Sequence, residues 1–154
     1  MPTLAESPSL TRRLEDAVAA VFGAVAGLAG LPIKAGISDG EIATPYMVIN
    51  ASRSGERIHA SGVYDFDVTA ILKTTAGDGP KATDDATLLA YDAAMEEALF
   101  GPSVQGLAAA ITAAGEYLRC DAVMSPGSEP TAFDDTRREI TYSFSAVCLA
   151  LPES

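Results

Sequence analysis

Histidine and cysteine are the first side chains to examine for chemistry, and this chain has few of them. The only histidine, His59, lies in a polar segment bounded by glycines, and the two cysteines are Cys120 and Cys148. A zinc site needs several such ligands, and a Cys–His nucleophile needs a spacing that this chain does not show. Both cysteines alternate with apolar neighbours on predicted strands, which is typical of small core residues kept reduced in a cytoplasm. The sequence leaves open whether the two thiols lie close together, and it predicts no catalytic residue here.

Three pairs of adjacent acids are the other candidates for acid–base or metal chemistry: Asp84-Asp85, Glu96-Glu97 and Asp134-Asp135. Two carboxylates can serve a hydrolase, and carboxylate oxygens suit a divalent cation. Each pair also has a structural explanation, because the first lies at an expected helix N-terminus, the second on the solvent face of that helix and the third in a loop. No phosphate-binding, dinucleotide-binding, zinc-protease or nucleophile-elbow motif occurs. We therefore expect no enzyme activity, no cofactor and no metal.

The composition is that of one globular domain spanning residues 1–154, with 48% apolar and 20% charged residues. This excludes a disordered chain, which combines low hydrophobicity with high charge. The 10 basic and 21 acidic residues give a formal charge of −11, so a basic footprint for clamping nucleic acid is absent, and no membrane partner is expected. The uncharged stretch 17–33 is too short and too rich in Ala and Gly to span a bilayer. It directly follows two acids, which is unlike a leader peptide.

Hydrophobic periodicity predicts helices and strands along the chain. Apolar residues three and four apart predict a helix over 10–28 with Ser7 as its N-cap, and Thr83 is expected to cap a second helix. Strict alternation predicts strands over 63–73 and 138–151. The remaining predicted elements are an edge strand over 33–37, a strand over 46–51, a helix over 104–114 and a strand over 116–124. Residues 52–62 are expected to form a loop or the tip of a long hairpin, and residues 125–135 a long loop.

This order predicts an α+β fold, a mostly antiparallel sheet of four to five strands with two to three helices packed on one face. The other face should be wetted or used for contacts. The expected core comprises sheet residues Val48, Tyr64, Phe66, Val68, Leu72, Tyr142 and Phe144, covered by helix residues Leu14, Val18, Val21, Val25, Leu88 and Met95.

Several segments of the chain together carry a resemblance to a known protein family. The resemblance rests on the amphipathic first helix over 10–28, the strand opening Thr44-Pro45-Tyr46-Met47-Val48-Ile49 and a polar hairpin leading into the alternating segment 64–72. It also rests on an acid-started helix and the closing segment 138–147. In this order of elements the chain is similar to the tail terminator (tail completion, or head–tail joining) proteins of long-tailed bacteriophages and gene transfer agents. The match covers nearly the whole chain as a pattern and contains no single specific motif.

The resemblance implies a structural virion protein, assembled in the host cytoplasm, that forms a homo-oligomeric ring, expected to be a hexamer, on the head-proximal end of the tail tube. Such a ring stops tube polymerisation and joins the tail to a neck, stopper or connector protein. DNA passes through its lumen without specific binding. Two alternatives stay open: another head–tail connector, such as a neck stopper or minor tail protein, and an unrelated small α+β binding domain or enzyme.

Two polar segments are the candidates for contacts between subunits, because they are too polar for the core and too long for tight turns. Their candidate interface residues are Arg53, Glu56, Arg57, His59, Glu129, Asp134 and Asp135. Solvent-facing acids of the strands, Asp65 and Asp67, are candidates to line the lumen together with Asp134 and Asp135, since an acidic channel repels DNA and lets it slide. The alternative is that these acids only solvate the outer surface.

Overall fold

The fold is described from a computed structural model, which covers residues 9–36, 44–57, 61–76, 83–101, 104–133 and 137–152. One sheet has the strand order β1-β2-β3-β5-β4, in which β1 and β2 are parallel and the other pairings are antiparallel. The strands are β1 (Ile33–Ala35), β2 (Tyr46–Glu56), β3 (Val63–Thr75), β4 (Leu118–Phe133) and β5 (Arg137–Ala150). The helices are α1 (Leu10–Gly23), α2 (Asp85–Phe100) and α3 (Val104–Ala114), with a 3-10 turn η1 over Ala26–Leu28.

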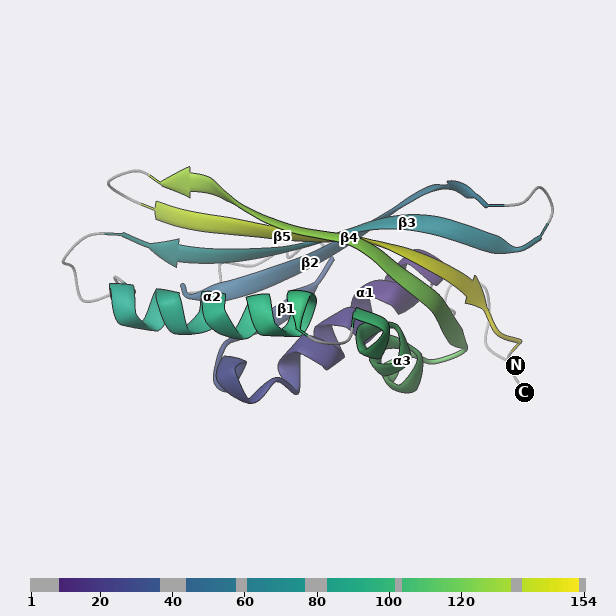
Figure 1. Ribbon diagram of the computed structural model, residues 1–154, viewed down its shortest axis with the longest axis horizontal. Coiled ribbons are helices and arrows are strands. Elements are labelled where there is room, and N and C mark those ends of the chain that lie inside the picture. Colours follow the sequence, from purple (N-terminus) through teal and green to yellow (C-terminus); the bar gives the residue numbers. More distant parts are fainter. Residues whose placement is uncertain are drawn as a thin grey trace.

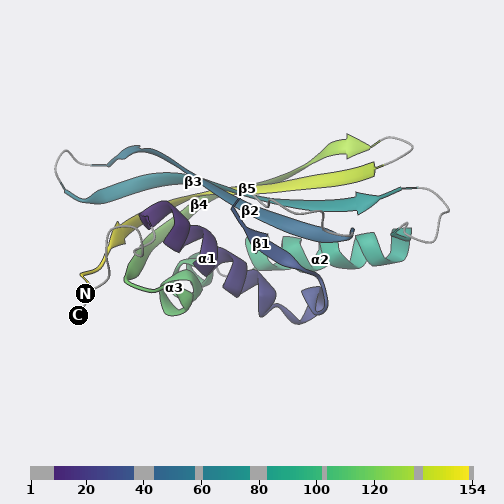
Figure 2. The ribbon, with the colours of Figure 1, turned by 180° about the vertical axis from the view of Figure 1, so that it is seen from behind.

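The described helices lie on one face of the sheet, as the side view in Figure 1 shows. α2 lies under one half of the long strands, α1 and α3 lie under the other half, and the view from behind places α1 beneath β1 and β2 (Figure 2). The α+β prediction is therefore confirmed, including the mostly antiparallel sheet and its one-sided helix layer. No helix in the described part of the chain is both long enough and apolar enough to cross a membrane.

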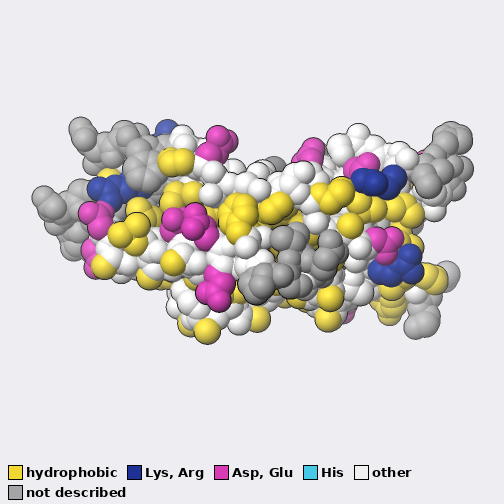
Figure 3. All heavy atoms as spheres, viewed as in Figure 1, with side chains coloured by type: hydrophobic (Ala, Val, Ile, Leu, Met, Phe, Trp, Pro, Cys, Tyr) yellow, Lys and Arg dark blue, Asp and Glu magenta, His cyan; other side chains and the backbone are white. Residues whose placement is uncertain are grey.

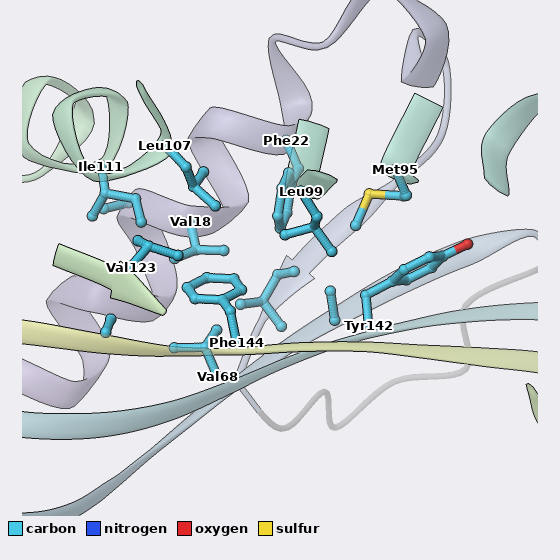
Figure 4. Close-up of a cluster of buried hydrophobic side chains, with 14 of the residues drawn as sticks. Val18, Phe22, Val68, Met95, Leu99, Leu107, Ile111, Val123, Tyr142 and Phe144 are labelled. Atoms are coloured by element: carbon cyan, nitrogen blue, oxygen red, sulfur yellow. The ribbon is translucent and has the colours of Figure 1, made fainter. Parts of the chain in front are cut away.

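The core fills the space between the sheet and the helices. Val68 on β3 lies opposite Phe144 on β5, and both side chains are buried because they point to the same face. Figure 4 shows Phe22 of α1, Leu99 of α2 and Ile111 of α3 directed toward this pair from the helix layer. Full burial of each such side chain contributes about 1.5–3 kcal/mol, which holds the helices to the sheet.

The expected core is confirmed except at one position of β2. Met47 and Ile49 are 0% exposed, whereas Val48 is half-buried on the opposite face, beside Ile71. The prediction for Val48 was wrong because residues 46–49 are all apolar, so alternation does not show which of them face the helices. The expected residues that are only partly buried, yet still pack against the core, are Val21, Val25 and Tyr64.

Both predicted helix starts were displaced by one or two residues. Ser9 is the N-cap of α1 and accepts a hydrogen bond from the Arg12 N–H at 3.1 Å, in the position assigned to Ser7, which lies outside the described residues. Asp84 rather than Thr83 caps α2, accepting from the Thr87 N–H at 2.7 Å. The first helix also ends at Gly23 instead of continuing to residue 28, and η1 follows it.

The long loop expected over 125–135 is wrong, because β4 continues as a strand to Phe133. Its pairing with β5 shifts register at three places: between Cys120 and Ala122, between Met124 and Gly127, and between Pro130 and Ala132. The residues that favour turns, and so predicted a loop, lie at or next to these irregularities and do not end the strand. Pro126 and Pro130 are tolerated because β4 is an edge strand, where a missing backbone donor need not break a ladder.

Two helix side chains form hydrogen bonds with backbone groups at the edges of the sheet. Glu15 of α1 is 8% exposed, and its carboxylate accepts from the Ala51 N–H of β2 at 2.9 Å. Thr112 of α3 accepts from the Cys120 N–H of β4 at 2.9 Å and donates to the Cys120 carbonyl at 3.2 Å. Free strand edges invite pairing with other chains, so these contacts protect both sides of the sheet at those positions.

Candidate interaction surface

The sheet surface opposite the helices, here called the uncovered face, is not covered by any described element (Figure 1). Two adjacent rows of short polar side chains cross its middle, in register on β2, β3 and β5: Asn50, Thr69 and Ser143, and then Ser52, Asp67 and Ser145. Such side chains give a flat, hydrogen-bonding surface that needs no apolar cover. The uncovered face is therefore suited to polar contacts or to water.

The β2–β3 hairpin carries the first group of predicted interface residues, and the structure pairs them within the hairpin. Arg57 Nε donates to Asp65 Oδ1 at 3.1 Å, and the Gly62 N–H donates to the Glu56 carboxylate at 2.9 Å. The guanidinium of Arg53 lies 4.7 Å from the ring centre of Tyr64. These contacts are exposed, so each is worth at most about 1 kcal/mol. They set the shape of the hairpin while leaving its charged groups accessible to a partner.

Asp65 and Asp67, the candidate lumen residues, share the uncovered face, as the alternation of β3 predicted. They differ in surroundings, because Asp65 is engaged by Arg57 while Asp67 accepts a weak hydrogen bond from Ser145 Oγ at 3.4 Å. Asp67 is the more exposed of the two and the freer to act on its environment.

The remaining predicted interface residues are not brought to the hairpin. Glu129 is exposed on β4 opposite Thr141, in a row that continues to Ile71 of β3. Ile71 lies six residues along β3 from Asp65, which corresponds to about 20 Å of strand. Glu129 therefore belongs to the opposite end of the uncovered face. His59, Asp134 and Asp135 lie outside the described residues.

Exposed apolar side chains on α2 are a feature that the sequence reasoning missed. Leu89 is 65% exposed and Phe100 is 46% exposed. They are eleven residues apart, so three helical turns place them on the same side of α2, and this spacing was the available signal. Figure 3 shows apolar side chains reaching the surface between acidic ones in the region of α2. A helix that carries apolar side chains both toward the solvent and toward the core is typical of a contact surface.

A groove of about 330 Å³ lies between η1 and α2. Gly27 allows the close approach of these elements, because a Cβ at this position would lie 2.7 Å from the Ala94 Cβ. The lining is small and mostly apolar: Val25, Ala26, Gly27, Ala94, Glu97 and Ala98. It offers one carboxylate and no nucleophile.

A buried side chain of the core, Tyr142, has a shifted pKa. The Tyr142 hydroxyl donates to Asp92 Oδ1 at 2.5 Å, and burial together with the Asp92 carboxylate raises the pKa of the phenol above its usual range.

Cys120 and Cys148 lie directly opposite each other in the β4–β5 ladder, which settles the question that the sequence left open. The described residues contain no group of three or more side chains that could hold a metal ion.

Comparisons with known proteins find a distant likeness among solved structures. No family model matches the chain, and no curated protein matches it. Among solved structures, a chain of the "Virion of native gene transfer agent (GTA) particle" is 17% identical, with 86% of this chain and 84% of that chain covered and a TM-score of 0.38. A likeness at this level does not establish a shared function.

Proposed function

We propose that this chain is a structural virion protein that forms a ring at the head-proximal end of a phage-type tail tube. The ring terminates tube polymerisation and joins the tail to the neck, and DNA passes through its lumen. The observation that best supports this proposal is the one-sided sheet, in which the described helices occupy one face and two rows of short polar side chains cross the middle of the other. Such a subunit can present one layer to its neighbours and the other to an aqueous passage.

The order of elements supports the same proposal. The structure contains the first helix, the strand that follows Thr44-Pro45, the hairpin into β3, the acid-started α2 and the closing strand β5. These are the segments on which the resemblance to tail terminator proteins rests. The longer β4, with its bulges, is an extension at the edge of this arrangement and leaves the order unchanged.

Available contact surfaces also suit a ring. A closed ring uses two different patches of each subunit, because each copy meets its neighbours head to tail. The hairpin displays Arg53 and Arg57, while α2 displays Leu89 and Phe100 and contains four acids and no base. Opposite charge and an apolar centre are the features that such a heterologous contact needs.

The function is tested with purified full-length chain and growing tail tubes. Light scattering is expected to give a closed oligomer, and tubes grown in its presence should be short and capped, with the chain bound at one end. A stable monomer that leaves tube length unchanged would contradict the proposal. Binding to portal rings instead of tube ends would replace it with a different connector role.

A hairpin variant locates the contact. Arg53→Ala combined with Arg57→Ala should leave the melting temperature nearly unchanged, because the hairpin contacts are exposed, while weakening ring formation at least tenfold. Lys73→Ala combined with Arg137→Ala also removes two positive charges, but at the other end of the sheet, near Thr75, and serves as the matched control. Equal ring formation by both variants would show that the hairpin is not the contact.

A further inference from the structure

The two thiols of the chain lie side by side in the core. Cys120 on β4 is directly opposite Cys148 on β5, and both are free and buried, with exposures of 6% and 0%. Directly opposite residues of antiparallel strands have Cα atoms about 4.5–5.5 Å apart, which falls within the range of about 4.4–6.8 Å that a disulfide spans. No strand movement is therefore needed to join them.

The hydrogen bonds around Cys120 show which kind of strand pair this is. Its N–H and its carbonyl both meet the Thr112 hydroxyl, at 2.9 and 3.2 Å, on the side of β4 that faces away from β5. The main-chain groups of Cys120 are thus not exchanged with Cys148, and the two residues form a non-hydrogen-bonded pair. In such a pair the backbones approach most closely and the side chains lie nearest each other, which favours contact between the sulfur atoms.

We propose that Cys120 and Cys148 are an oxidation site at which a small disulfide compound converts the two thiols into a cross-strand disulfide between β4 and β5. The Cys120 thiolate attacks one sulfur of the compound and releases the other half as a thiolate. The Cys148 thiol then loses its proton and attacks the Cys120 sulfur, displacing the second half. Two protein thiols are oxidised, and one small disulfide is reduced to two thiols.

The surroundings assign the first attack to Cys120. The hydrogen bond from Cys148 lowers the pKa of the Cys120 thiol, while the same contact and burial raise the pKa of Cys148. Cys120 also lies on the edge strand, at a register shift that follows it directly, so local opening of β4 exposes it first. Cys148 remains on an inner strand and is placed to resolve the mixed disulfide.

The bond would fix the edge strand to the rest of the sheet. Since Thr112 joins Cys120 to α3, the disulfide would also restrain the attachment of that helix. A protein assembled in a reducing cytoplasm and then released would acquire this bond after assembly.

The test incubates the folded full-length chain with hydroxyethyl disulfide and then counts thiols by alkylation and mass spectrometry. We expect both thiols to disappear, the mass to fall by their two hydrogen atoms, and the melting temperature to rise by about 5 °C or more, reversed by a reductant. Cys148→Ala should stop at the mixed disulfide, with the mass raised by the hydroxyethylthio group, and Cys120→Ala should keep its buried thiol, because Cys120 is the group attacked first. Neither variant should show the rise in melting temperature.

A displaced thiol provides the geometric control. Combining Ala146→Cys with Cys148→Ala moves the second thiol two residues along the same face of β5, to a diagonal position about 7–8 Å from Cys120. This double variant should form the intramolecular bond at least tenfold more slowly. The proposal is overturned if the native chain keeps both thiols, if it forms only cross-linked dimers, if the bond appears only in denaturant, or if both arrangements react equally fast.

Discussion

Tyr142 is a polar group at the centre of an apolar core, and its hydroxyl determines how β5 and α2 meet. The side chain is 1% exposed, and the hydroxyl donates to Asp92. A buried phenol without an acceptor would cost about 1–3 kcal/mol, so Asp92 makes the placement of Tyr142 possible. Because a phenol with a raised pKa donates protons poorly, this pair is structural.

The Tyr142–Asp92 pair predicts a loss of stability in alkali. The pKa of Tyr142 in the folded chain is raised above its ordinary value of 10.0. Its contribution is therefore fully present below pH 10 and declines above it, where the unfolded chain ionises first. Tyr142→Phe should be less stable than the native chain at pH 7, and the difference should shrink above pH 10. Urea unfolding across pH 7–11 measures this, and two parallel curves would contradict it.

At the scale of elements, the carboxylate of Asp84 caps the N-terminus of α2. The side chain and the backbone N–H of Thr87 donate to Asp84, and these hydrogen bonds lower the pKa of the Asp84 carboxyl. Its contribution is present above the ordinary value of 3.8 and is lost as the pH falls through the lower, folded value.

Substituting Asp84 tests the helix start. Asp84→Ala should lower the melting temperature at pH 7, because an N–H of the first turn of α2 loses its acceptor. Asp84→Asn keeps an acceptor oxygen, so it should retain most of the stability and lose the acid dependence that this carboxylate contributes. Thermal melts at pH 3 and pH 7 separate the two variants. Thr83→Ala should not reproduce the loss of the cap.

How far the sequence predicts each element depends on how regular its pattern is. β3 and β5 alternate strictly, so their bounds and buried faces were predicted closely, and the bounds of α3 agree with its predicted range. The second half of β4 could not be predicted, because Pro126, Gly127 and Pro130 normally favour turns. They remain extended here only because β5 supplies a partner along a bulged edge. That partnership is a tertiary effect that no local pattern contains.

The candidate surface was predictable in place but not in detail. The polar composition of residues 52–62 predicted a loop or the tip of a hairpin there. The pairing of Arg57 with Asp65, in contrast, depends on the register shift between Arg53 and Gly55. Glu129 was grouped with a loop because its neighbours favour turns. The exposed Leu89 and Phe100 were overlooked, since helical apolar residues are ordinarily assigned to a core.

For the whole molecule, the division into a helix layer and an uncovered face gives the acids different surroundings. Asp67 lies on the uncovered face, whereas Asp16 is an exposed acid of α1 in the helix layer. If the uncovered face lines the passage proposed above, Asp67 faces the DNA directly and its charge repels the DNA across the solvent, whereas the acid of the helix layer does not face the passage.

A charge reversal at each place tests this division. Asp67→Lys should allow tails to assemble but slow the release of DNA, more strongly at low salt, where screening is weak. Asp16→Lys makes the same charge change in the helix layer, outside the contact proposed for α2, and should release DNA at the native rate. Release from assembled particles across a salt series measures both. Native rates for Asp67→Lys at every salt concentration would place the passage elsewhere.

Glu15 and Thr112 also bear on how many molecules can join. A sheet with open borders can add strands without end, as fibrils do, and the product then has no fixed size. Here a carboxylate occupies the Ala51 N–H on one border, and a hydroxyl occupies the Cys120 backbone on the other. Sideways growth is obstructed at these two positions, which favours association through side chains over pairing of strand edges. In the ring proposed above, such obstructed edges favour a finite number of copies over fibril growth.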